Sequence, residues 1–268
     1  MAIPCFQVDA FSDRPFGGNP AAICLLEEPP ADRWLQHFAQ EMNLSETAYL
    51  LKQQDGYGLR WFTPALEVDL CGHATLASAH VLYEEGLVPL DDAIRFHTRS
   101  GVLTATMRDD LIWLDFPARP VNAVTPPPAL LAALGVKPAW SGITGGGDAL
   151  HRNFLLELES EQAVRAVRPD FRGIAEATNS GVMVTSRAES PGQDFVSRYF
   201  APYSGIDEDP VTGSAHCTLA PFWSSKLGRL DMVGFQASAR GGTVHVRSLG
   251  ARVQLGGTAV TVLRGMVA

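Results

Sequence analysis

Residues 72–85, GHATLASAHVLYEE, decide the fold. The segment is small and apolar almost all round, and only its last turn carries charge. A helix that is hydrophobic on every side is buried on every side. Short segments with strand-like composition follow it at 93–98, 102–108 and 111–116. The pattern therefore predicts a central helix enclosed by a curled sheet.

The residues before this helix predict the rest of a sheet and one helix that covers it. Apolar residues recur at helical spacing between Pro30 and Asn43, which indicates an amphipathic helix. A turn rich in Gly and Pro is expected around 16–20. Strands are expected at 5–11, 22–26, 47–52 and 58–62.

The second half of the chain repeats the first. Arg60-Trp61-Phe62-Thr63-Pro64 recurs 138 residues later as Arg198-Tyr199-Phe200-Ala201-Pro202. Gly72-His73-Ala74 recurs 141 residues later as Gly213-Ser214-Ala215, and a weaker match sets Asn153 against Asn19. Matches in the same order at about half the chain length indicate an internal duplication. We therefore expect an α+β protein of two pseudo-symmetric domains, each a mixed, barrel-like sheet around a central helix.

A proline-rich segment at 115–128 marks the connection between the two domains. The N-terminal domain is expected to span 1–118 and the C-terminal domain 119–257. A last strand is expected at 258–265, and the repeat leaves no place for it in the second domain. We expect the segment from about 258 to 268 to return to the first domain. A helix is expected at 160–168 or at 169–178.

Composition excludes several classes of function. The formal net charge is −8 over 268 residues, without a Lys/Arg cluster, which disfavours a nucleic-acid partner. The sequence holds no apolar stretch of 18 residues and no basic segment before an apolar run, so neither a membrane span nor a signal peptide is expected. Four scattered cysteines are typical of free thiols in a reducing cytoplasm.

The two central helices begin alike, at Cys71-Gly72-His73 and at Thr212-Gly213-Ser214. A helix N-terminus presents unpaired N–H groups and a partial positive charge, and glycine permits close approach of a ligand. Two such ends would hold a carboxylate. The alternative is that glycine only lets a buried helix begin. His73 lies in the first turn, where it serves either as a core residue or as a hydrogen-bonding group.

Ser45 and Glu46 lie between the end of a helix and an apolar strand. Partial burial raises the pKa of a carboxyl group toward the range that proton transfer requires. Spacing alone leaves Glu46 either as an acid/base group or as a solvated surface residue.

Three consecutive acids precede the second helix start, at 207–209. Asp209 is expected to face a ligand or to cap the helix. No pair of histidines has ligand spacing nearby, so no metal site is expected. His80, His216 and Cys217 are interpreted as core residues.

Five ordered motifs resemble those of the phenazine-biosynthesis PhzF-like family. The resemblance covers essentially the whole chain and includes the late segment Gln236–Gly242. The motifs are Gly18-Asn19-Pro20, Asn43-Leu44-Ser45-Glu46-Thr47, Phe62-Thr63-Pro64 with Glu67, Cys71-Gly72-His73-Ala74-Thr75 and Asp209-Pro210-Val211-Thr212-Gly213-Ser214-Ala215.

The resemblance implies the fold of diaminopimelate epimerase, with two pseudo-symmetric domains, and an isomerase that needs no cofactor. Glu46 matches the residue that moves the proton, and His73 and Asp209 match residues at the same pocket. These three are the expected catalytic residues. The expected substrate-binding residues are Asn19, Ser45, Gly72, Gly213 and Ser214.

One departure from the epimerases narrows the chemistry. Those enzymes use one cysteine from each domain, directly before each helix start. Cys71 occupies the first place, whereas the second falls in Asp209-Pro210-Val211 and has no thiol. Cys217 lies a turn too far into its helix. Diaminopimelate epimerisation and proline racemisation are therefore disfavoured, because a two-thiol racemase needs both groups.

The leading hypothesis is a cytoplasmic, cofactor-independent isomerase that moves a proton on a small carboxylate or amino-acid-like substrate. Glu46 acts as general acid/base in a cleft between the domains. One alternative is an epimerase or racemase that uses Cys71 with Glu46. Another is a small-molecule binding protein of the same fold without turnover. The sequence names neither the substrate nor a role in phenazine synthesis, and it leaves a homodimer open.

Overall fold

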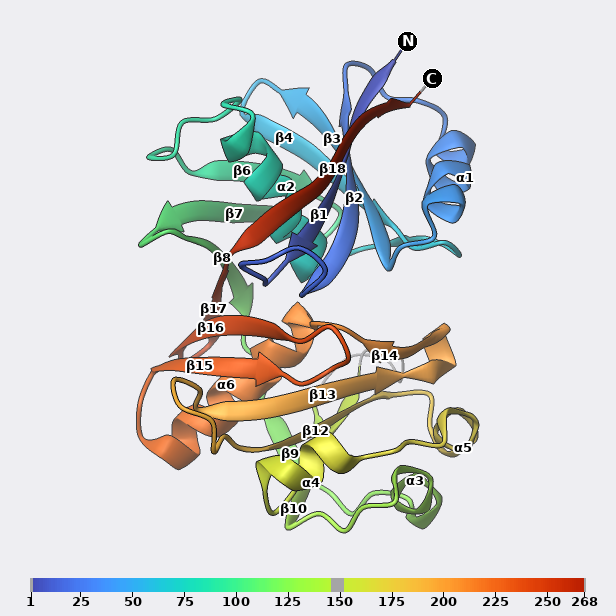
Figure 1. Cartoon of the computed structure of the whole chain (residues 1–268), viewed down its shortest axis with the longest axis vertical. Coiled ribbons are helices and arrows are strands. Elements are labelled where there is room, and N and C mark those ends of the chain that lie inside the picture. Colours follow the sequence, from blue (N-terminus) through green and yellow to red (C-terminus); the bar gives the residue numbers. More distant parts are fainter. Residues whose placement is uncertain (1, 146–151, 268) are drawn as a thin grey trace. The chain divides into compact units, whose positions relative to one another are not determined.

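A computed structural model describes residues 2–145 and 152–267. The chain divides into two compact units (Figure 1). The first unit comprises Met1–Phe116 with Gln254–Ala268, and the second comprises Pro117–Val253. None of the helices in the described ranges is long and apolar enough to cross a membrane.

The first unit is a mixed sheet with two helices. Strand β2 pairs antiparallel with β1 and parallel with β3, β3 pairs antiparallel with β4, and β4 pairs parallel with β6. The helices are α1 (Asp32–Met42) and α2 (Gly72–Glu84). The strands are β1 (Ile3–Ala10), β2 (Asn19–Leu26), β3 (Glu46–Gln53), β4 (Gly56–Phe62), β5 (Glu67–Val68), β6 (Ile94–Thr98), β7 (Gly101–Arg108), β8 (Leu111–Pro117) and β18 (Ala259–Val267).

Strand β18 returns to the first unit, where it pairs antiparallel with β1 from Ile3 opposite Val267 to Ala10 opposite Ala259 (Figure 1). The predicted turn at 16–20 ends earlier than expected, because β2 begins at Asn19. Gly18 has a φ of +59°, and a Cβ there would lie 2.1 Å from the carbonyl oxygen of Ala10. Only glycine fits this turn, and pairing resumes directly after it.

Helix α2 is buried on nearly every side, as its composition predicts. Its interior residues from His73 to Ala79 are all buried. The hydroxyls of Thr75 and Ser78 donate to the carbonyl oxygens of Cys71 and Ala74, four residues back. The polar groups of these side chains are therefore satisfied within the helix, which permits full burial.

The second unit repeats this topology. Strands β11 and β12 are parallel, as β2 and β3 are, and β13 pairs antiparallel with β12 and parallel with β15. Helix α6 (Gly213–Leu227) is the counterpart of α2. The remaining elements of this unit are β9 (Val121–Ala123), α3 (Pro128–Leu134), β10 (Trp140–Thr144), β11 (Asn153–Glu157), α4 (Glu161–Ala166), α5 (Phe171–Ala177), β12 (Gly181–Arg187), β13 (Phe195–Ala201), η2 (Pro202–Ser204), β14 (Ile206–Asp209), β15 (Asp231–Gln236) and β16 (Gly242–Leu249). Strand β17 (Arg252–Gly257) crosses the boundary between the second unit and the first.

This topology confirms the predicted α+β fold with two related units. Both helices that were weighed as alternatives between 160 and 178 exist, as α4 and α5. Their apolar residues join α3 in covering the outer face of the β11–β13 sheet.

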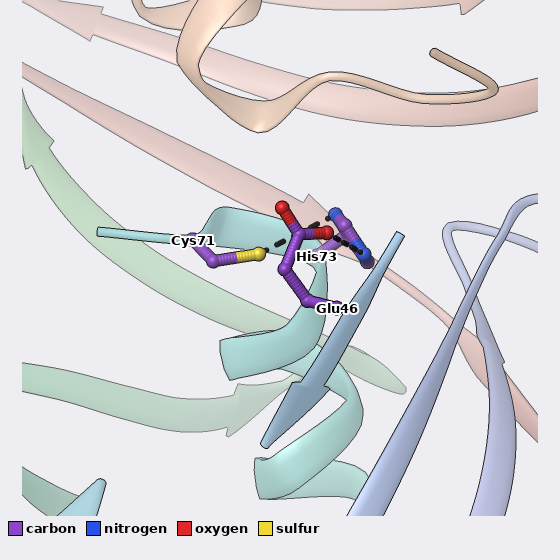
Figure 2. Close-up of side chains that lie close together, drawn as sticks. All are labelled: Glu46, Cys71 and His73. Carbon is purple, nitrogen blue, oxygen red and sulfur yellow. Dashed lines mark hydrogen bonds and ion pairs between the residues drawn. The ribbon is translucent and has the colours of Figure 1, made fainter. Parts of the chain in front are cut away.

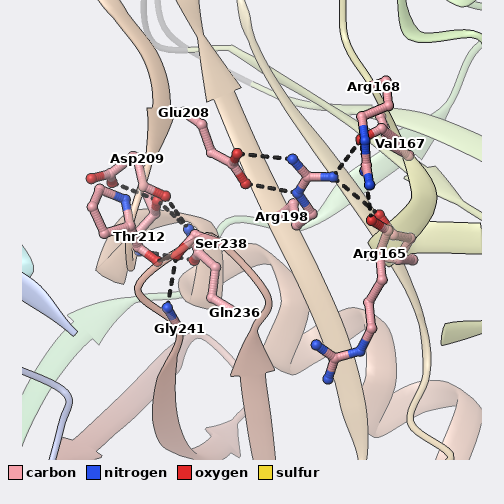
Figure 3. A network of polar contacts seen from close by, with 12 residues as sticks. Arg165, Val167, Arg168, Arg198, Glu208, Asp209, Thr212, Gln236, Ser238 and Gly241 are labelled. Carbon is pink, nitrogen blue, oxygen red and sulfur yellow. Dashed lines mark hydrogen bonds and ion pairs between the residues drawn. The ribbon is translucent and has the colours of Figure 1, made fainter. Parts of the chain in front are cut away.

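Matching arginine–glutamate pairs show that the repeat extends to side chains. Arg60 donates through Nε and Nη2 to both carboxylate oxygens of Glu67, each at 2.7 Å. Arg198 makes the same two bonds to Glu208, at 2.7 and 2.8 Å (Figure 3). Each guanidinium also lies over the phenylalanine two residues later, at 5.1 and 5.0 Å from the ring centre.

The strand register corrects the weakest sequence match. Counted from the matched arginine segments, Gly181 is the counterpart of Glu46. Asn153 pairs with Gly181, and Ala21 pairs with Glu46. Asn153 therefore corresponds to Ala21 and not to Asn19, so that match was wrong by two residues.

Replacing Arg198 with Met is expected to destabilise the protein by about 3 kcal/mol, because Glu208 stays largely buried without its guanidinium. Arg198 also donates to the carbonyl oxygens of Val164 and Val167 at the end of α4. The matched Arg60→Met variant is expected to cost about 1 kcal/mol, because Arg99 still lies 2.6 Å from Glu67. Urea unfolding of both variants measures the difference. Equal losses would contradict the expectation.

Glu161 is expected to make the protein acid-sensitive. Burial raises the pKa of this carboxyl, but N–H donation from Glu189, the guanidinium of Arg165, and Ser190 together lower that pKa to about 2. Against about 4.3 in the unfolded chain, this contributes about 3 kcal/mol, present above pH 4.3 and lost as the pH falls toward 2. The difference in unfolding free energy between wild type and Glu161→Gln should shrink by that amount over this range. A constant difference would show that ionised Glu161 adds nothing.

Candidate active site

Glu46 is positioned by the passage from α1 to β3. Helix α1 ends at Met42, and Asn43 adopts a left-handed conformation with φ of 50°, which turns the chain toward the sheet. Glu46 is then the first residue of β3. Its side chain is only 13% exposed. The alternative of a solvated surface acid is therefore wrong.

The Glu46 carboxylate meets two residues at the start of α2. Nε2 of His73 lies 3.1 Å from Oε2 of Glu46, and Sγ of Cys71 lies 3.5 Å from Nδ1 of His73. Figure 2 shows the three side chains gathered at the N-terminus of the helix. Within the described part of the chain, neither Oε2 nor Nε2 has a hydrogen-bond partner, although both atoms are buried. Their contact is thus one of charge and proximity rather than an aligned hydrogen bond.

Two further predicted residues belong to the same cluster. Nδ2 of Asn19 lies 3.2 Å from Nδ1 of His73, and the hydroxyl of Ser45 donates to Oδ1 of Asn19 at 3.4 Å. Gly72 is the first residue of α2, between Cys71 and His73. The first unit therefore brings together Glu46, His73, Asn19, Ser45 and Gly72, all named from the sequence.

The buried charges fix the protonation of the cluster. Burial lowers the pKa of His73, but the negative charges of Cys71 and Glu46 outweigh it and hold that pKa well above its usual value. Burial, reinforced by Glu46, raises the pKa of Cys71, against the effect of His73. The pKa of the Cys71 thiol and the pKa of the His73 imidazole are therefore both raised, so each group holds its proton more tightly than it would in water.

In the second unit, Asp209 belongs to a hydrogen-bond network with Thr212 and Gln236. Thr212, directly before α6, donates its hydroxyl to Oδ2 of Asp209 at 2.5 Å. Gln236 accepts the N–H of Thr212 at 2.9 Å and donates to Oγ1 of Thr212 and to the carbonyl oxygen of Asp209 (Figure 3). Gly213 and Ser214 begin the helix. Gln236 was missed as a site residue, although its segment was part of the family resemblance.

Comparison of the two units shows how their chemistry differs. In the register, Gly181 stands where Glu46 does, and Asp209 stands where Val68 does. A Cβ on Gly181 would lie 2.1 Å from the hydroxyl of Tyr199, so no side chain fits there. The candidate site carboxylates, Glu46 in the first unit and Asp209 in the second, thus stand at different positions of the repeat.

The helix starts differ in the same way. Thr212 and Ser214 replace the thiol and the imidazole of Cys71 and His73. The place expected for a second thiol is therefore Thr212, one residue later than the sequence motif suggested, because α6 begins at Gly213.

The other sequence candidates have structural roles. His216 is fully buried, and burial lowers its pKa to about 4, so it is a neutral core residue as predicted. His80 lies 3.1 Å from Thr261 of β18 and 3.4 Å from Glu84. Among the described residues, the acids at 207–209 form no group with metal-ligand spacing, whereas Glu46, Cys71 and His73 do.

Comparison with known proteins places this geometry in a family. The family model described as phenazine biosynthesis-like protein, PhzC-PhzF, matches residues 8–265. The chain belongs to this family. It is 47% identical to an uncharacterised isomerase of Halalkalibacterium halodurans, over 98% of each chain. A PhzF-family crystal structure from Enterococcus faecalis matches with a TM-score of 0.93 and 39% identity, over 100% of both chains.

A predicted epimerase of Pseudomonas aeruginosa shares the fold, with a TM-score of 0.73 and 19% identity over 99% of each chain. The predicted family, the epimerase-like fold and the enzyme class of isomerase are confirmed. The assignment of individual catalytic residues stays a prediction.

Proposed function

We propose that this PhzF-family protein is a cofactor-independent isomerase that moves a proton on a small carboxylate or amino-acid-like substrate. Glu46 is the general acid/base, and it takes a proton from one carbon and returns it to another. His73 orients the substrate and stabilises charge beside Glu46. The prediction that Asp209, Gly213 and Ser214 of the second unit take part in the same reaction is retained.

The observation that carries this proposal is the buried pair of Glu46 and His73. A carboxylate Oε2 and an imidazole Nε2 that are buried 3.1 Å apart without aligned hydrogen bonds can each accept a new partner. The Glu46 carboxylate in turn raises the pKa of His73, so the imidazole beside it holds a proton and can stabilise negative charge on a substrate. A positioned acid/base group of this kind supplies about 10²–10⁴-fold in rate.

The start of α2 supports binding of an anionic substrate. The first N–H groups of a helix are unpaired within it and carry a partial positive charge. Gly72 places no side chain over these groups. In a chain with a net charge of −8, such a local positive site favours a small carboxylate over larger anions that the whole surface repels.

The same geometry disfavours a racemase that uses Cys71 against Glu46. Two-base inversion places an acid and a base on opposite faces of one carbon, each about 3–3.5 Å from it, which separates them by about 6–7 Å. Donor atoms of Cys71 and Glu46 lie within 4.8 Å of each other. That spacing suits neighbours on one face of a substrate.

Glu46→Gln is expected to lower solvent deuterium exchange into the substrate by about 10²–10⁴-fold, because the amide cannot accept the proton. A panel of small carboxylates and amino acids incubated in D₂O, with mass spectrometry as readout, first finds a substrate. Glu41→Gln is the matched control, since Glu41 is exposed on α1. Exchange at the wild-type rate in Glu46→Gln would remove Glu46 from the mechanism.

The product is expected to be a constitutional isomer with its proton on a different carbon, because one carboxylate serves both steps. NMR locates the deuterium in the product, and chiral chromatography of the same sample measures inversion. Accumulation of the enantiomer or epimer, with deuterium on the original carbon, would favour the racemase with Cys71 instead.

A further inference from the structure

We propose that Glu46, Cys71 and His73 form a binding site for a soft divalent cation, with zinc as the best fit. The sequence predicted no metal site, because the acids at 207–209 are neighbours in the chain whereas Glu46 lies far from Cys71 and His73. The three residues come from two segments, the start of β3 and the start of α2, and only the fold brings them together (Figure 2).

The distances match the coordination geometry of zinc. Zinc binds thiolate sulfur at about 2.3 Å and imidazole nitrogen at about 2.0–2.1 Å, so two such ligands of a tetrahedral ion lie about 3.6 Å apart. Sγ of Cys71 and Nδ1 of His73 are 3.5 Å apart. One donor atom from each of the three residues lies within 4.8 Å of the others.

The donor set also suits the charge of the ion. Binding breaks the S–H bond of Cys71 and the Nδ1–H bond of the His73 imidazolium, forms a sulfur–zinc and a nitrogen–zinc bond, and releases both protons to water. The thiolate and the Glu46 carboxylate then balance the two positive charges of zinc, and neutral His73 completes three protein ligands. Oε2 of Glu46 and Nε2 of His73 are buried without a hydrogen-bond partner among the described residues, so Glu46 gives up no hydrogen bond through Oε2.

Asn19 is the group that the ion would displace. Its amide nitrogen lies 3.2 Å from Nδ1 of His73, on the nitrogen that faces Cys71. This amide therefore occupies the side of Nδ1 at which the cation would bind. Removing this side chain is therefore expected to leave zinc binding as tight as in the wild type, or tighter.

A zinc ion in this position would occupy the carboxylate that the proposed function assigns to proton transfer. Inhibition by zinc is the consequence, and this part rests on the proposed function. Zinc binding itself does not depend on the proposed function, because it needs only the three ligands. Three protein ligands leave one coordination position for water or a substrate carboxylate.

Titration of the full-length protein with zinc chloride by calorimetry tests the site. One zinc per chain is expected, and Cys71→Ser should weaken binding by about 100-fold or more, since loss even of groups behind a ligand costs about 10–100-fold. Cys217→Ser is the matched control, a buried cysteine on α6. Both Cys217→Ser and Asn19→Ala should bind zinc at least as tightly as the wild type. Cobalt chloride should give a thiolate charge-transfer band in wild type that Cys71→Ser lacks.

Equal binding to wild type and Cys71→Ser, or no binding to wild type, would overturn the proposal. A second measurement needs no variant: zinc should protect Cys71 of the wild-type protein from alkylation, located by peptide mass spectrometry. If Cys71 is alkylated without zinc and reacts at the same rate under saturating zinc, the proposal is also overturned. These outcomes are independent of Glu46→Gln exchange, so the metal site and the proposed function can fail separately.

Discussion

The burial of α2 on nearly every side is the constraint on which the first unit depends. A buried helix must satisfy its own polar groups, and Thr75 and Ser78 do so by bonding back to the preceding turn. The ring of His73 does not bond to the helix backbone in this way, because it extends from the first turn toward the sheet. It meets Asn19 at one nitrogen and Glu46 at the other. The candidate site therefore lies where a polar side chain of the central helix depends on partners from the sheet.

Two buried charges that face each other explain why the arrangement persists. Either ion alone would pay a large desolvation penalty, whereas a carboxylate and an imidazolium in contact offset part of it for each other. The geometry is not ideal, since the contact lacks an aligned hydrogen bond. A pair held together but imperfectly bonded is poised to exchange one partner for a ligand. In the second unit, by contrast, Thr212 and Gln236 form well-directed bonds around Asp209.

The sequence predicted the fold more fully than the site. The apolar pattern of 72–85 and the repeated arginine segments follow local rules, so helix, sheet and duplication could be inferred directly. Glu46 could not be placed by spacing, because its burial depends on the parallel pairing of β2 with β3, which aligns Ala21 with Glu46 across 25 residues. Only the family resemblance singled it out. Gln236 escaped notice because its partners, Asp209 and Thr212, lie far away in sequence.

Duplication followed by divergence accounts for a single reactive cluster. The arginine–glutamate pairs that brace β4 and β13 are kept in both units, because each fixes a hairpin of its own sheet. The position of Glu46 has no such structural role. Its counterpart in the second unit is Gly181, which lies against Tyr199. With no second carboxylate at the matching place and no second thiol, a symmetric pair of bases is excluded within the duplicated positions. A reaction that needs only one proton-transferring group fits the single carboxylate, Glu46. The Cys71 thiol beside it makes the same cluster a ligand set for a soft cation.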